Sequence, residues 1–120
     1  MRLNRIQSYW PWVFYFSLFG IFLWPLVTGD MAFVYGDYGN QFYPWLWKYA
    51  MELKRFSLPL WISTIHAGFP LFAEGQTAML YPPNLLLFFF LPFKTAFNGV
   101  LWLHFLMGAA FMYRWVRLQE

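Results

Sequence analysis

The stretch Gly36-Asp37-Tyr38-Gly39-Asn40-Gln41-Phe42-Tyr43-Pro44-Trp45 places one carboxylate and two amides between two long apolar segments. The segment before it, residues 6–28, and the later segment of residues 95–113 contain no Asp, Glu, Lys or Arg. Runs of this length without a charge are typical of helices that cross a membrane. The pattern predicts that the polar stretch lies at a membrane surface, outside two such helices.

The composition supports a lipid environment for much of the chain. Hydrophobic residues make up 61% of the sequence and charged residues only 11%, whereas a soluble domain averages about 25% charged residues. Sixteen Phe, eight Trp and eight Tyr exceed what one small core can bury while leaving a wettable surface. The net charge of +3 comes largely from the two ends, which favours anionic lipid headgroups and not nucleic acid as a partner.

Residues 6–28 are predicted to form the first transmembrane helix. The run has 23 residues, and about 20 are enough to cross a bilayer core. Tyr and Trp side chains near both ends suit the two membrane interfaces. A basic leader, residues 1–5, precedes the run, so a cleaved signal peptide has a similar outline; the run is long for one, however, and lacks a small-residue cleavage site.

Residues 95–113 are predicted to form the second transmembrane helix. Gly99, Gly108, Ala109 and Ala110 are small residues of the kind that allow membrane helices to approach closely. The preceding apolar segment, residues 85–91, is flanked by prolines and is too short to cross a bilayer, so it is predicted to lie at the interface.

The positions of the basic residues predict the orientation of the two helices. Arg2, Arg5, Arg114 and Arg117 flank the outer sides of the pair. The positive-inside rule then places residues 1–5 and 114–120 in the cytoplasm and the loop of residues 29–94 outside. The expected fold is an all-α membrane protein with two transmembrane helices joined by a long outer loop that contains interfacial helices.

Residues 38–56 of this loop are predicted to form an amphipathic helix. Its apolar positions recur at the spacing of one helical face, and they are Phe42, Trp45, Leu46, Tyr49, Ala50 and Leu53. Lys48, Glu52 and Arg55 fall mostly on the opposite side. The helix is expected to lie on the membrane, and the alternative is a helix packed on the protein surface with no ligand.

Four segments together resemble a known family. The succession GDYGNQFYPW, LPLWISTIHAGFPLF, EGQTAMLYPPNLL and LHFLMG, in this order, resembles the N-terminal portion of the YfhO-like bacterial membrane proteins. These belong to the GT-C class of multi-span glycosyltransferases. The resemblance implies a multi-pass protein of the bacterial inner (plasma) membrane that takes a sugar from a polyprenyl-phosphate donor at the outer face, for glycosylation of a cell-envelope polymer or lipid.

The same resemblance implies that the chain is a fragment of a larger GT-C bundle. Activity would then require the missing C-terminal spans or a partner membrane protein, and the chain alone is expected to be inactive. The alternative is a small non-enzymatic membrane subunit or anchor that binds lipid or a partner through its aromatic outer loop. A transporter fragment would need an acid within a span, and neither predicted span contains one.

The resemblance assigns the catalytic carboxylate to Asp37. A carboxylate at the membrane surface can accept the proton of a sugar-accepting hydroxyl, although Asp at the start of a helix is also a common cap. Gln41 follows one helical turn later, and Asp30 lies seven residues before Asp37, on the same face if the segment is helical. The other candidates for substrate binding are His66, Gln76 and Tyr81.

The sequence predicts no metal site, because no spacing of His, Asp or Glu is diagnostic of one. A divalent metal ion is nevertheless one way to neutralise the leaving phosphate. His104 lies inside the second predicted span, and it is expected to form a hydrogen bond with a neighbouring helix.

Overall fold

The computed structural model describes the backbone of residues 5–28, 32, 35–65 and 67–119. Over these residues the chain is mostly helical and contains no strand, which confirms the all-α class. The elements in order are α1 (Arg5–Thr28), a π-helical turn (Tyr38–Phe42), α2 (Tyr43–Leu53), α3 (Leu71–Glu74), α4 (Pro82–Phe90) and α5 (Phe93–Gln119).

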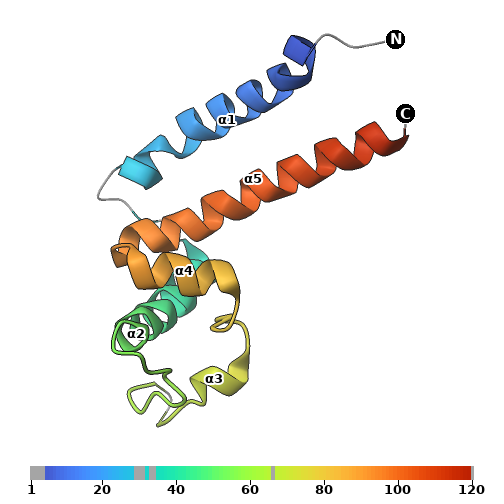
Figure 1. The fold of residues 1–120 in the computed structure, drawn as a ribbon. Helices are drawn as coiled ribbons and strands as arrows, with labels where there is room; N and C mark the ends of the chain where they lie inside the picture. The colour runs from blue at the N-terminus through green and yellow to red at the C-terminus, as the bar shows by residue number, and fades with distance from the viewer. Residues whose placement is uncertain (1–4, 29–31, 33–34, 66, 120) are drawn as a thin grey trace.

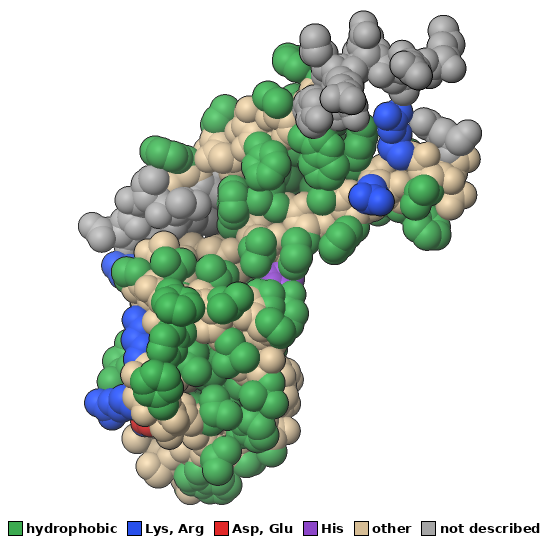
Figure 2. All heavy atoms as spheres, in the orientation of Figure 1, with side chains coloured by type: hydrophobic (Ala, Val, Ile, Leu, Met, Phe, Trp, Pro, Cys, Tyr) green, Lys and Arg blue, Asp and Glu red, His purple; other side chains and the backbone are tan. Residues whose placement is uncertain are grey.

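The helices form a long hairpin with a smaller body at one end (Figure 1). Helices α1 and α5 run antiparallel, as two ring contacts show (Figure 1). The ring centroids of Trp12 and Tyr113 lie 5.3 Å apart, and those of Phe19 and Phe105 lie 6.1 Å apart. The body consists of residues 38–92 and packs against the Phe93 end of α5. Hydrophobic side chains cover most of the visible face, whereas Lys and Arg gather at the far end of the hairpin and along one edge of the body (Figure 2).

Helix α5 is long and apolar enough to cross a membrane, and it is the one described helix that is. Its 27 residues correspond to about 40 Å. It begins two residues before the predicted span and continues past Arg114 to Gln119, because arginine ends an apolar run without ending a helix. Helix α1 coincides with the first predicted span, but its described apolar stretch, Trp10–Ile21, is shorter than a membrane crossing. This first span, residues 6–28, therefore stays a prediction.

Gly99 and Gly108 of α5 make no close contact with the described part of α1. A methyl group added at Gly108 would have nothing within 4 Å, and at Gly99 it would meet only Leu87, at 4.0 Å. A cavity of about 230 Å³ lies between the helices near Ala109 and Ala110. Whether these small residues pack against a further membrane helix stays a prediction.

The apolar face of α2 forms the centre of the body. Trp45, Leu46, Tyr49 and Ala50 are buried, and Phe42 and Leu53 pack against them. Phe88 of α4 and Ala96 and Phe97 of α5 complete this core. The helical spacing is thus confirmed. The face packs inside the protein, however, so the expectation that this face lies on a membrane surface is wrong.

The predicted helix over residues 38–56 is divided between Phe42 and Tyr43, next to Pro44. Tyr43 donates its backbone N–H to Tyr38 O, five residues back, which is the π-helical pattern. Pro44 has no N–H to donate, and its ring would clash with the carbonyl four residues earlier in a regular helix. The widened turn relieves this clash, and a regular helix follows from Tyr43.

Helix α2 ends in a Schellman motif with an unusual residue. Ser57 N–H bonds Glu52 O at 3.0 Å and Phe56 N–H bonds Leu53 O at 2.9 Å, the pair of bonds that defines the motif. Phe56 occupies the left-handed position, with a φ of 58°, where glycine is usual. A side chain costs about 1–2 kcal/mol in this conformation.

The loop between α2 and α4 folds back onto α2. Ile62 and Phe69 exchange two backbone hydrogen bonds of 2.8 Å, and the Phe69 ring stacks on Trp45 at 4.9 Å. Helix α4 begins at Pro82, three residues before the predicted apolar segment, because proline suits the first turn of a helix. Asn84, in this first turn, donates hydrogen bonds to Thr77 O and Ala78 O, both at 3.2 Å.

Stability should fall in alkali because of Tyr49. Burial raises the pKa of the Tyr49 hydroxyl from 10 to about 12, so its contribution to stability is complete below pH 10 and is lost as the pH rises from 10 to 12. Tyr49→Phe should flatten this decline in the melting temperature, measured by circular dichroism in detergent micelles. At neutral pH the variant should lose about 1 kcal/mol, because Met79 O loses its 2.7 Å hydrogen bond.

Exposed Tyr35 provides the matched control, since Tyr35→Phe should leave the alkaline decline unchanged. Tyr38, whose pKa is also raised by burial, should account for the part that survives in Tyr49→Phe. An alkaline decline as steep in Tyr49→Phe as in the wild type would contradict the assignment.

Candidate functional site

A pocket of about 410 Å³ opens beside the turn that precedes α2. Its polar lining comes from consecutive turns of one segment, namely Asp37, Asn40 and Gln41. Pro44 and Trp45 at the start of α2 and Ile65 of the following loop supply the apolar walls. The pocket therefore combines one carboxylate with two amides on a rigid apolar floor.

Two neighbours of Asp37 fix the position of its backbone. Gly36, with a φ of 56°, occupies the left-handed conformation that turns the chain into the helix. Tyr38 packs its ring against Phe97 of α5 at 4.6 Å, and burial raises the pKa of its hydroxyl. The pocket is thereby held next to the first turns of α5, at the opposite end of that helix from Arg114 and Arg117.

The Asp37 side chain does not cap the helix. Asp37 stands at the N-cap position of the π-helical turn, but its φ and ψ of −62° and −28° are already helical, and its carboxylate makes no capping hydrogen bond. A capping aspartate has an extended backbone and accepts a hydrogen bond from an N–H in the first turn. The alternative role for Asp37 as a cap is wrong, and Asp37 is exposed and lines the pocket.

Gln41 and Gln76 are brought together from distant parts of the sequence. Gln41 Nε2 lies 3.5 Å from Gln76 Oε1. Gln76 is itself held by its backbone N–H, which donates to Glu74 Oε2 at 2.8 Å across a turn at Gly75. The structure thus places three predicted site residues, Asp37, Gln41 and Gln76, in and beside one pocket.

Tyr81 belongs to a different group, at the junction of α4 and α5. Its hydroxyl lies 3.1 Å from His104 Nε2, while His104 Nδ1 lies 2.6 Å from Val100 O. Because a carbonyl oxygen only accepts, Nδ1 carries the proton and Nε2 accepts the hydrogen bond from the Tyr81 hydroxyl. His104 therefore joins α5 to the residue that precedes α4, and Tyr81 does not line the Asp37 pocket.

The remaining predicted residues lie outside this constellation. Asp30 and His66 fall outside the described residues. Among the residues that are described, no three His, Asp or Glu side chains gather into a group that could hold a metal ion. The lining residue that sequence reasoning missed most clearly is Ile65, because no local pattern indicates which loop residue will reach the start of α2.

The pocket favours neutral hydroxyl groups over anions. Its lining contains no Lys or Arg. Lys48 of α2 does not line the pocket and forms an ion pair with Glu52 at 2.7 Å. The hydrogen bond from Lys48 lowers the pKa of Glu52. Amide groups can donate to and accept from hydroxyls, and the Asp37 carboxylate can accept a proton.

Comparisons of the chain with protein-family models, curated proteins and solved structures give no match.

Proposed function

We propose that this chain is the N-terminal part of a membrane glycosyltransferase that uses a polyprenyl-phosphate-linked sugar at the outer membrane face. The observation that carries the proposal is the Asp37 carboxylate, which is exposed, makes no capping hydrogen bond, and shares a pocket with two amides. The resemblance to the YfhO-like proteins, which rests on the ordered succession of segments over nearly the whole chain, supplies the reaction class. Helix α5 supports the membrane location.

Asp37 acts as the general base in this proposal. Its carboxylate accepts the proton of the acceptor hydroxyl while the hydroxyl oxygen forms a bond to the anomeric carbon of the sugar. The bond from that carbon to the phosphate oxygen breaks, and its electron pair leaves with the phosphate. Asn40 and Gln41 hold sugar hydroxyls by hydrogen bonds.

The leaving phosphate needs positive charge that this pocket lacks. No Lys or Arg lines it, so the charge comes from a divalent cation or from spans outside these 120 residues. Exposed hydrophobic side chains along α1 and α5, among them Ile21, Phe111 and Trp115, offer surfaces for such spans. The reading frame after codon 120 distinguishes a continuing polypeptide from a separate partner.

Asp37→Asn should abolish most of the transfer activity. In the complete membrane protein that contains this segment, the loss should be about 10²–10⁴-fold, as expected for removal of a general base. Transfer of a radiolabelled sugar from polyprenyl phosphate to the acceptor, measured in membrane vesicles, tests this. Asp37→Glu should recover part of the activity.

The matched control is Glu52→Gln, which removes a carboxylate of the same body that does not line the pocket and is paired with Lys48. This variant should transfer sugar at the wild-type rate. Wild-type transfer by Asp37→Asn would refute the role of Asp37.

The body is proposed to face the outside and the Arg114 end of α5 to face the cytoplasm. The chain contains no cysteine, so single cysteines report the topology cleanly. Ser63→Cys, at an exposed loop position, should react with an impermeant maleimide on intact cells, and Gln119→Cys should react only after lysis. The reverse pattern would show that the orientation is inverted.

A further inference from the structure

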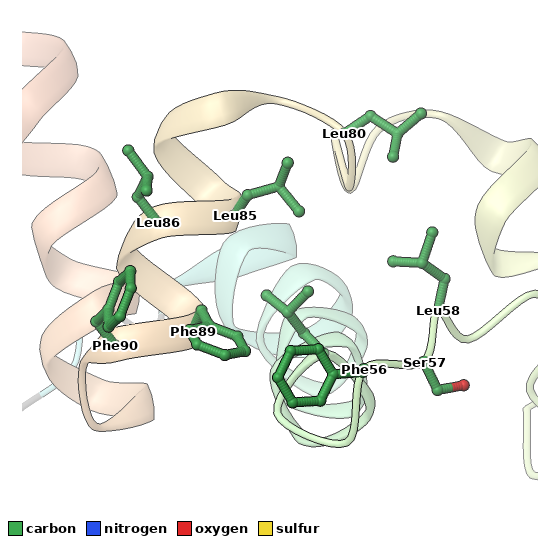
Figure 3. A pocket seen from close by; sticks show the side chains of 9 residues that line it. Phe56, Ser57, Leu58, Leu80, Leu85, Leu86, Phe89 and Phe90 are labelled. Atoms are coloured by element: carbon green, nitrogen blue, oxygen red, sulfur yellow. The ribbon is translucent and has the colours of Figure 1, made fainter.

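An apolar groove separates α4 from the end of α2 (Figure 3). Its volume is about 390 Å³, within the roughly 300–1,000 Å³ of small-ligand pockets. Eight of its nine lining side chains are hydrophobic, and Ser57 is the exception. In Figure 3, Leu85 and Phe89 of α4 point toward Phe56, Leu58 and Leu80 on the other side. The groove thus fits an elongated apolar group.

Phe56 stands at the edge of this groove without being covered by the chain itself. Its side chain is 87% exposed, and among the described residues its ring contacts that of Phe89, with the two centroids 5.4 Å apart. Glycine would relieve the left-handed backbone at this position, and burial within the chain does not compensate for the strain. A phenylalanine at this position indicates that something outside the chain contacts its ring.

The groove lies near the start of α5, which is the membrane interface if α5 crosses the bilayer as proposed. Its rim includes Leu86 and Phe90, which are 59% and 73% exposed, and α5 begins three residues after Phe90. The first turns of a membrane-crossing helix lie at the bilayer interface. Hydrocarbon of the bilayer is therefore the apolar material nearest to the groove.

Two cationic residues stand between the lining residues Leu53 and Phe56 in the sequence. Lys54 and Arg55 immediately precede Phe56 and are exposed, and Lys54 Nζ donates to Leu91 O at 3.0 Å, which holds the ammonium group between the ends of α2 and α4. The nearby acid, Glu52, pairs with Lys48 and also interacts with the charge of Arg55. An anionic group beside the groove would meet two cations.

The geometry points to a binding site for one acyl chain of an anionic bilayer phospholipid such as phosphatidylglycerol. The acyl chain occupies the groove against Phe56 and Phe89, and the lipid phosphate lies beside Lys54 and Arg55. Each methylene group removed from water adds to the affinity, and the two cations select anionic over zwitterionic headgroups. This site is separate from the Asp37 pocket and does not depend on glycosyl transfer.

Native mass spectrometry of the purified full chain, released from mixed micelles with equal amounts of phosphatidylglycerol and phosphatidylcholine, tests this site. The wild type should retain one phosphatidylglycerol. Phe56→Gly and Arg55→Gln should each reduce retention by about tenfold, equivalent to about 1.4 kcal/mol. Phe56→Gly should melt at or above the wild-type temperature, because glycine is favoured at its position.

Two control variants separate this site from other effects. Leu60→Ala, at an exposed apolar position outside the groove, and Asp37→Asn, in the other pocket, should both retain the lipid as the wild type does. If Phe56→Gly lowers the melting temperature, Leu86→Trp replaces it as the test variant. The larger side chain should fill the groove from its rim and reduce the retention of phosphatidylglycerol.

Three results would overturn the site. They are equal retention of the two phospholipids, wild-type retention by the groove variants, and displacement of phosphatidylglycerol by an equimolar isoprenyl phosphate. The last result would identify the groove as a carrier site and not a phospholipid site.

Discussion

Tyr49 ties together three parts of the body that are distant in sequence. Its ring packs against Phe88 of α4, and its hydroxyl donates a 2.7 Å hydrogen bond to Met79 O in the loop before α4. The side chain is fully buried, so this hydrogen bond satisfies two polar atoms that would otherwise be costly. The loop can turn back toward α2 because this anchor holds it, and both the Asp37 pocket and the apolar groove depend on the resulting position of α2.

Local patterns predicted those parts of the fold that rest on local forces. The buried face of α2 follows from the helical spacing of Trp45, Leu46, Tyr49 and Ala50, and α5 follows from its long apolar run. What covers the α2 face could not be predicted, because a membrane and the neighbouring helix α4 are equally apolar. The break at Pro44 was missed because its cause, a clash with the preceding turn, disturbs the hydrogen-bond pattern without altering the hydrophobic pattern.

The same distinction applies to the site. Asp37 and Gln41 are four residues apart, so their shared location could be predicted from local geometry. Gln76 joins them only because the loop folds back onto α2, and Tyr81 departs from them because α4 begins directly after it and turns it toward His104. Such placements depend on contacts across many residues, and no short sequence pattern contains them.

The composition of the core has a consequence for the order in which the protein forms. Its buried residues lie between Trp45 and Phe97, and no described side chain of α1 belongs to it. Chains are synthesised from the N-terminus, so α1 and α2 are made before Phe88 and Phe97. The apolar face of α2 must therefore wait, uncovered, until the first turns of α5 have been made. A newly made chain is most exposed to aggregation and to chaperones during that interval.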